Sequence, residues 1–393
     1  MKRLHRHIAP VMLVTIFIAT MFAGCYRKPL YLAQRGNVAV MVLDYEFDYD
    51  ILWGAEWNSD WQYPWNEVAL GPLGYTLPTG LHAIAYQLDG NMQRVRRHYD
   101  RHFGVDGGNL SLAANNSYDV LLYNDDTEWI LFPDRDAVHD SIYANFGATT
   151  RTYSKAQYTR TRTHAGYNQP DLLYGRLIDN LHVSEDPDDY EELRTEDGSI
   201  IYVRKVETTL YPYTYIYLYQ VMLLNNADAE GTIVTSGAGL TANGLASGVD
   251  LFSRRTHGDV VSLTQENMAP LVKEVPLTLP DGTDTQGDIL AARIQTWGMP
   301  DIVPHEELTR SEGTEPADST FVGVGLRLRN GYTYVMQKNV TEQMKERPAG
   351  GVITFVVDVT REIPDSIINH KGGGGFQATV NQWDNETRVE IQI

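Results

Sequence analysis

The residue with the clearest chemistry in this sequence is Cys25, the only cysteine among 393 residues. A cysteine thiolate is a strong nucleophile, and at this position it is a natural acceptor for a diacylglycerol group. Because the chain has no second cysteine, it cannot form an internal disulfide. Stability outside the cytosol must therefore come from packing.

The residues before Cys25 have the three-part layout of a secretory signal peptide. A positively charged start at residues 2–6 is followed by an apolar run at 8–22 and then by small residues. The apolar run is too short for a comfortable membrane span. Residues 22–25, Phe-Ala-Gly-Cys, resemble a bacterial lipobox, so we predict a lipoprotein signal peptide at 1–24 and lipidation of Cys25. An ordinary cleaved signal peptide is the alternative.

The other reactive side chains form no recognised catalytic motif. Gly-x-Ser-x-Gly, His-Glu-x-x-His and a phosphate-binding Gly-Lys-Ser/Thr loop are all absent. The best isolated candidate is His305-Glu306-Glu307, and folding could still bring together carboxylate pairs of the kind that hydrolyse glycosides. We expect a protein that is not an enzyme and that holds no cofactor and no metal.

Four tryptophans recur at every fourth position: Trp53, Trp57, Trp61 and Trp65. Aromatic faces of this kind can stack on sugar rings, which would suit a surface glycan-binding lipoprotein. Such a cluster more commonly covers the end of a β-sandwich. We favour the covering role and keep glycan stacking by these four residues as the alternative function.

An acidic stretch, 185–192, contains Glu185, Asp186, Asp188 and Asp189 around Pro187. It lacks the alternating ligands and the turn glycine of a calcium-binding loop. We therefore predict that residues 170–209 are a linker with a solvated acidic loop.

Charge limits the choice of partners. Lys2, Arg3 and Arg6 are the only charged residues before Cys25, and losing them changes the net charge from −19 to −22. Such an acidic chain repels phosphate backbones, so we expect no nucleic acid partner. It also repels an anionic membrane surface, which leaves a lipid on Cys25 as the tether.

Tyrosine is the main compositional signal, with 24 Tyr against 10 Phe and 7 Trp. Tyrosine and threonine favour strands, and 33 Gly with 17 Pro supply turns, so we predict an all-β protein. The strongest strand signal is 210–224, where tyrosines alternate with other residues. The chain is long enough for two domains, which we place at 25–169 and 210–393.

The order of several motifs resembles the fimbrillin-like lipoproteins of Bacteroidetes, which are the subunits and anchors of type V pili. Each motif is short, but together they cover most of the chain after Cys25. In order, they are 107–112, 118–128, 213–224 with the Gly-rich 236–248, Thr296-Trp297-Gly298, 339–344 and 380–384.

This resemblance implies two tandem transthyretin-like Greek-key β-sandwiches and export as a lipoprotein. In the stalk subunits of such a family, a protease cuts behind an arginine, and removal of the first strand opens a groove for a neighbour's C-terminal strand. This chain has no Lys or Arg between Gly36 and Gln93. A trypsin-like cut could fall only at Arg27 or Arg35, which would spare the first strand, or at Arg94.

We therefore predict a non-catalytic outer-membrane lipoprotein that acts as a fimbrial anchor, accessory or adhesin subunit. Its expected partners are other fimbrial subunits, the outer membrane through its lipid, and a host or bacterial glycan or protein ligand. The expected location is the cell outer membrane, with a fimbrium at the cell surface as a further possibility.

The C-terminal residues are the candidate subunit-donor strand. Apolar and polar residues alternate there, and four glycines, 372–375, lie upstream. Such a strand either folds back onto its own sandwich or adds to an open sheet edge of another subunit. The residues are Arg388, Val389, Glu390, Ile391, Gln392 and Ile393.

Overall fold

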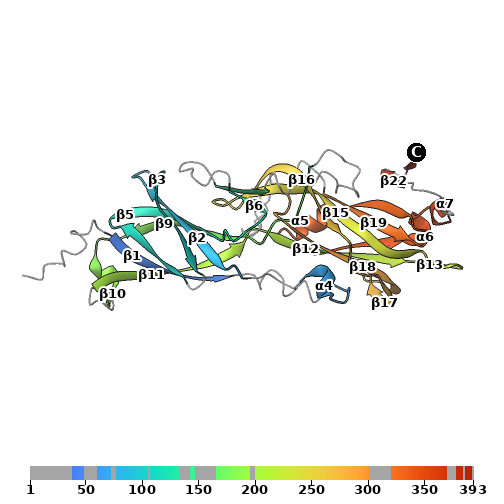
Figure 1. The fold of residues 1–393 in the computed structure, drawn as a ribbon, viewed down its shortest axis with the longest axis horizontal. Coiled ribbons are helices and arrows are strands. Elements are labelled where there is room, and N and C mark those ends of the chain that lie inside the picture. Colours follow the sequence, from blue (N-terminus) through green and yellow to red (C-terminus); the bar gives the residue numbers. More distant parts are fainter. Residues whose placement is uncertain are drawn as a thin grey trace, which may run out of the picture.

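The structure is a computed structural model, and it shows an elongated molecule of two layered bodies placed end to end (Figure 1). Cys25, Trp53, Trp57, the His305-Glu306-Glu307 segment, the glycines 372–375 and residues 392–393 lie outside the part that it describes. The described ranges are 38–47, 60–71, 77–104, 107–132, 142–146, 165–194, 200–300, 320–369, 378–383 and 386–391.

The first body is a sandwich made from one sheet that turns a corner. Its strand order is β3-β2-β5-β9-β11-β1-β4, with β10 also paired to β11. The corner lies in β11, whose first part pairs with β1 and β10 and whose last two residues pair with β9. The strands are β1 (Val38–Phe47), β2 (Gly80–Leu88), β3 (Arg94–Gly104), β4 (Gly108–Ala113), β5 (Asn116–Tyr123), β9 (Tyr174–Val183), β10 (Glu191–Arg194) and β11 (Ile200–Pro212).

The second body packs a four-stranded sheet on a larger one. The smaller sheet has the order β17-β18-β12-β21, and the larger has the order β23-β22-β20-β19-β15-β16-β8, with β7 also on β15 and β6 on β7. The smaller sheet contains β12 (Tyr215–Leu224), β17 (Val272–Thr278), β18 (Asp284–Thr296) and β21 (Gly351–Asp358). The larger contains β6 (Ile130–Leu131), β7 (Tyr143–Phe146), β8 (Ala165–Tyr167), β15 (Val234–Asp250), β16 (Thr256–Glu266), β19 (Phe321–Leu328), β20 (Thr333–Asn339), β22 (Ala378–Trp383) and β23 (Glu386–Ile391).

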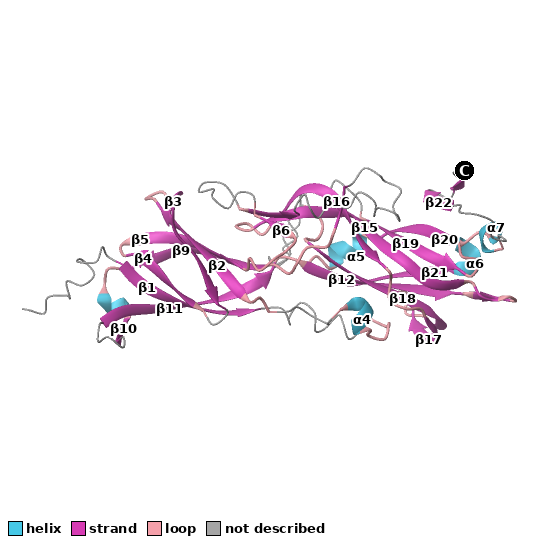
Figure 2. Ribbon diagram, in the orientation of Figure 1, coloured by secondary structure: helices cyan, strands magenta, loops and turns pink. Residues whose placement is uncertain are grey.

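Helices are short and peripheral in the described part of the chain (Figure 2). They are α4 (Glu67–Leu70), η2 (Pro187–Asp189), α5 (Thr341–Glu346), α6 (Val359–Glu362) and α7 (Asp365–Ile368). Two further short strands, β13 (Ala227–Asp228) and β14 (Gly231–Thr232), pair only with each other. The predicted all-β class is confirmed. The transthyretin-like Greek-key topology stays a prediction.

The chain crosses between the two bodies more often than the sequence division suggests. Strands β6, β7 and β8 follow the first body in sequence but belong to the large sheet of the second. The chain then returns, and β9, β10 and β11 complete the first sheet. Residues 170–209, expected to be a linker, therefore include paired strands. The physical reason is that Tyr174, Leu181 and Val183 are apolar and are buried in β9, between β5 and β11.

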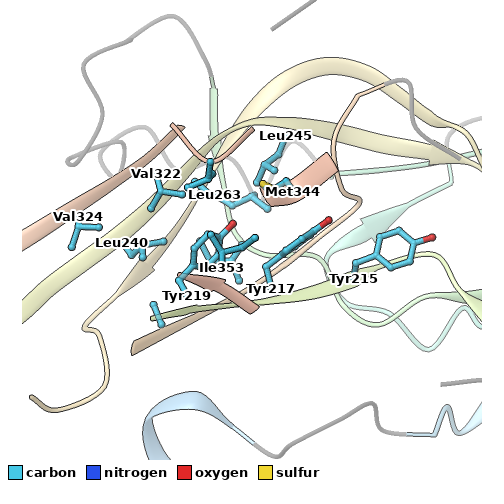
Figure 3. Packing of buried hydrophobic residues seen from close by; sticks show 14 of the residues in the cluster. Tyr215, Tyr217, Tyr219, Leu240, Leu245, Leu263, Val322, Val324, Met344 and Ile353 are labelled. Atoms are coloured by element: carbon cyan, nitrogen blue, oxygen red, sulfur yellow. The ribbon is translucent and has the colours of Figure 1, made fainter. Parts of the chain in front are cut away.

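The strand β12 is the centre of the molecule, since nine of its ten residues are buried. On one face, Tyr217 and Tyr219 point into the core of the second body, opposite Leu240 and Val322 of the large sheet (Figure 3). On the other face, Ile216 and Leu218 belong to the core cluster of the first body. One strand therefore contributes side chains to both cores.

Candidate assembly surfaces

The N-terminal strand β1 is built into the interior of its sheet. It pairs in parallel with β11, from Val40 opposite Val203 to Phe47 opposite Leu210. Its other edge pairs antiparallel with β4, from Val38 opposite Ala113 to Leu43 opposite Gly108. Loss of β1 would leave the backbone groups of two neighbouring strands without these partners. The predicted lipidation site, Cys25, precedes this strand in sequence.

The C-terminal strand, in contrast to β1, lies at the edge of its sheet. Strands β22 and β23 form an antiparallel hairpin from Ala378 opposite Ile391 to Trp383 opposite Glu386. The hairpin joins the large sheet through one pair, Val335 of β20 with Thr379 of β22. Because β23 is the terminal strand in the order, residues 388–391 of the candidate donor segment present one backbone edge that no described strand pairs with.

The segment 60–71 crosses from the first body and covers the outer face of the four-stranded sheet. The Gln62 side chain donates to the Thr278 carbonyl at 2.7 Å and accepts from the Thr278 amide at 2.8 Å. The Tyr63 hydroxyl donates to the Pro270 carbonyl at 2.7 Å, and burial raises the pKa of this tyrosine. We call residues 60–71 the strap.

The two described tryptophans of the predicted cluster belong to this strap. Trp61 and Trp65 are half-buried, and their ring centroids lie 6.3 Å apart. Both rings pack against buried residues of the two bodies, and the ring centroids of Trp61 and Tyr63 lie 6.0 Å apart. Trp61 and Trp65 therefore cover a sheet face and not the end of a sandwich, and their packing leaves these two rings less suited to stacking on a glycan.

The junction between the bodies is tied by aromatic and polar contacts. The Tyr213 hydroxyl donates to the Leu251 carbonyl at 3.0 Å, and burial raises the pKa of Tyr213. The Arg94 guanidinium lies 3.7 Å from the centre of the Phe252 ring, a cation–π contact. These contacts join β3 and the residue that follows β11, Tyr213, to the turn after β15, so side chains as well as the backbone hold the two sandwiches together.

The arginine-rich strand β3 lies at the edge of the first sheet. None of its eleven residues is buried. Arg94 pairs with Asp119 at 3.1 Å and Arg97 with Asp100 at 2.8 Å, so acidic neighbours offset two of its positive charges. Charged side chains on an edge strand disfavour pairing with another chain.

A small polar cleft lies beside the junction. It has a volume of about 330 Å³ and is lined by Leu77, Pro78, Asn124, Asp126, Pro170, Asp171, Leu172, Tyr174 and Gln295. Its two aspartates accept hydrogen bonds from the chain itself: Asp126 from the Thr79 amide and Asp171 from the Trp129 amide. The carboxylates therefore hold loops in place, and this is a structural role.

One group of side chains was missed in the sequence. His82, His102 and Asp125 lie close enough together to hold a metal ion, although they are far apart in the chain. No spacing rule pointed to them, because a strand pairing brings them together.

None of the helices in the described part of the chain has the length and apolar character needed to cross a membrane.

Comparison with known proteins gives a family match and several structural neighbours. A family model described as "Domain of unknown function (DUF5119)" matches residues 65–253. No curated protein matches the chain. The solved structures that are similar to it include a "putative adhesin" from Bacteroides ovatus, at 16% identity and a TM-score of 0.46, covering 85% of this chain and 97% of that one.

Two further neighbours have lower similarity. One is the fimbrial anchor protein Mfa2 from Porphyromonas gingivalis, at 10% identity and a TM-score of 0.38, covering 84% of this chain and 93% of that one. The other is described as "putative polysaccharide binding proteins" from Bacteroides thetaiotaomicron, at 8% identity and a TM-score of 0.38, covering 81% of this chain and 91% of that one. Adhesin and fimbrial anchor are the kinds of protein that the resemblance in the sequence indicates.

Proposed function

We propose that this chain is a non-catalytic lipoprotein of the bacterial outer membrane that anchors a fimbria or serves as its accessory or adhesin subunit. The observation that carries the proposal is the contrast between the two chain ends. The first strand, β1, is held on both edges by β11 and β4, whereas the last strand, β23, has one edge without a strand partner among the described residues. A subunit of this form keeps its own first strand and offers its last.

The absence of Lys and Arg between Gly36 and Gln93 also supports a subunit that keeps its first strand. A protease that cuts behind arginine has no site within β1 or in the residues that follow it up to β2. A cut at Arg27 or Arg35 would separate the chain from a lipid at Cys25 and leave β1 in place. The anchoring role therefore requires that the peptide bonds after Arg27 and Arg35 stay intact in the cell.

The first experiment tests the membrane tether. Cys25→Ser should abolish labelling by radioactive fatty acid and move the protein from the membrane fraction to the soluble fraction, because thioether formation needs sulfur. Tyr26→Phe is the matched control and should leave labelling and fractionation unchanged. Membrane association of Cys25→Ser at the wild-type level would refute the lipid anchor.

The second experiment tests the C-terminal strand. Deletion of residues 387–393 should leave a folded, lipidated protein that no longer co-purifies with other fimbrial subunits. In a strand, Val389 and Ile391 are expected on one face and Arg388 and Glu390 on the other. Val389→Asp with Ile391→Asp should therefore act like the deletion, and Arg388→Ala with Glu390→Ala should not. If the deleted chain is insoluble and protease-sensitive, the strand belongs to the protein's own core and the donor role is wrong.

The glycan-binding alternative has weaker support, since Trp61 and Trp65 pack within the strap. Affinity electrophoresis in gels that contain plant or host polysaccharides tests it directly. We expect no retardation of the wild-type protein. Retardation that disappears in Trp57→Ala would favour the glycan-binding function over the fimbrial function.

A further inference from the structure

A compact group of nitrogen and oxygen ligands lies at one end of the first sandwich. His82 is in β2, His102 is in β3, and Asp125 follows β5. The three strands are neighbours in the order β3-β2-β5, and His82 lies directly opposite His102 in the register of the β2–β3 hairpin. One ligand atom from each of the three residues lies within 4.8 Å of the others.

Two register shifts in this hairpin create the pairing. They lie between Ala85 and Tyr86 and between Gln87 and Leu88, and each adds one residue to β3. Without them, the register that starts at Leu88 opposite Arg94 would place Asp100 opposite His82. The bulges instead place His102 there, and they turn Asp100 into a neighbour on the far side of the His82 ring.

Asp125 and Asp100 contact different nitrogens of the His82 ring. Nδ1 of His82 lies 3.1 Å from Asp125 Oδ2, and Nδ1 of His102 lies 3.3 Å from Asp125 Oδ1. Both imidazoles therefore direct the same ring nitrogen at a single carboxylate. The two rings are close, with centroids 4.4 Å apart in an edge-to-face arrangement.

The other ring nitrogen of His82, Nε2, and the face of the ring also have neighbours that fix its orientation. Its Nε2 atom makes a close contact with Asp100, whose other oxygen lies 2.8 Å from the Arg97 guanidinium. The His82 ring also stacks on Tyr123, with centroids 5.2 Å apart. In metal sites, a ligating histidine commonly donates its second ring N–H to a carboxylate, which fixes its tautomer and orientation. Asp100 is placed to accept that hydrogen bond.

We propose that His82, His102 and Asp125 bind one divalent transition-metal ion, for which Zn²⁺ is the best match. Imidazole nitrogens select such ions over Ca²⁺ and Mg²⁺, which prefer oxygen ligands. Zinc bonds to nitrogen and oxygen are about 2.0–2.2 Å, so ligand atoms around a tetrahedral ion lie about 3.3–3.5 Å apart. The two histidines approach different oxygens of Asp125, at 3.1 and 3.3 Å, and one ligand atom from each residue lies within 4.8 Å of the others, so a small closure would bring them to that spacing. Three protein ligands leave a fourth position for water.

Exposure is graded across the group in a way that suits an ion entering from solvent. The side chain of His102 is 63% exposed, that of Asp125 is 17% exposed and that of His82 is 1% exposed. Bound metal would join the edge strand β3 to β2 and to the end of β5. In a chain whose only cysteine is Cys25, such an ion supplies a cross-link that a disulfide cannot.

The test uses residues 26–393 without a histidine tag, treated with EDTA and titrated with Zn²⁺ in a calorimeter. We expect one ion per chain, a higher Tm with zinc, and, after Co²⁺ substitution, a visible spectrum typical of tetrahedral coordination. His102→Ala should weaken binding by at least about tenfold and abolish the zinc-dependent rise in Tm. This variant is informative because His102 is exposed, so its loss should not prevent folding.

Two more variants complete the design. His98→Ala removes a histidine from the same strand whose ring lies against Tyr118, and it should bind zinc as the wild type does. Asp100→Asn should weaken binding by about 10–100-fold, the usual range for loss of a hydrogen-bond partner of a ligand. The proposal is wrong if the wild type binds no stoichiometric zinc, or if His102→Ala and the wild type bind it equally.

Discussion

Strands β12 and β3 represent two extremes of the same all-β fold. Strand β12 lies between β18 and β21, and both of its faces are covered. One face packs in the core of the second body; the other packs on the core of the first body at Ile216 and Leu218 and under the strap at Met222. Strand β3 is at the edge of the first sheet and has no buried residue. The first is rich in tyrosine and aliphatic residues, and the second carries four arginines.

This difference teaches which parts of the molecule are available for contact with other chains. A strand covered on both faces can only contribute to stability, because every substitution meets packed neighbours. An edge strand decides whether the sheet accepts another strand, and the arginines of β3 discourage that. Association is therefore expected at other edges, of which β23 is the one that we propose.

The largest expected effect is at the centre of β12. Leu218→Asp would bury a carboxylate in a fully apolar site, since Leu218 is 0% exposed. We expect the free energy of unfolding to fall by more than about 4 kcal/mol, enough to leave little folded protein. Val95→Asp in β3 is the matched control, because Val95 is 45% exposed, and it should change stability by less than about 0.5 kcal/mol. Urea denaturation followed by circular dichroism measures both, and equal effects would remove the contrast.

A second pair of variants separates packing from hydrogen bonding in β12. Tyr219→Ala should cost about 3–5 kcal/mol, as expected for loss of a large buried aromatic. The Tyr219 hydroxyl has no hydrogen-bond partner among the described residues. Tyr219→Phe should therefore be neutral or stabilising, since it removes a buried polar atom that makes no bond there. A loss of stability in Tyr219→Phe would indicate a partner for the hydroxyl.

High pH should weaken the same region. Burial raises the pKa of Tyr213 and of Tyr219, so the folded state keeps these protons at pH values where the unfolded chain has released them. The unfolded pKa is about 10, so stability should be unaffected below that pH and should fall as pH rises above it. Denaturant midpoints measured at increasing alkaline pH test this, and the decrease should be shallower in Tyr219→Phe.

The smallest expected effect on stability is at the exposed arginines of β3. Arg96→Ala with Arg101→Ala should change the free energy of unfolding by less than about 0.5 kcal/mol, because both side chains are exposed. Self-association should increase instead, since the edge loses charges that oppose strand pairing. Light scattering over a range of protein concentrations measures this, and a monomer at every concentration would show that the arginines do not protect the edge.

Local patterns in the sequence predicted strands well. The alternation in 210–224 predicted the strand that the structure shows as β12, Tyr215–Leu224, although the first residues of that stretch belong to the end of β11. A period-two pattern is readable in this way because it depends on nearby residues only. The covering of β12 on both faces was not predictable from that alternation. The second face is closed by the first body and by the strap, which are distant from β12 in the sequence.

Pairings between distant strands were also beyond the sequence. Nothing local to β7 or β8 indicates that they pair with β15 and β16, and the acidic stretch after β9 suggested a linker where the chain in fact turns back into the sheet. The His82–His102 pair depends on two bulges, and a bulge has no dependable sequence signal in this hairpin. Register, therefore, was the missing information at the candidate metal site.

The placement of β1 also limits when the first sheet can close. In the exported lipoprotein that we propose, the N-terminus emerges first, so Val38–Phe47 appears long before β11, where Val40 finds its partner Val203. Contacts of such long range form slowly. Until β11 is exported, one edge of this apolar strand is open to aggregation with other chains. If the proposed export is correct, a chaperone that binds extended apolar segments is therefore expected to be needed until β11 has been exported.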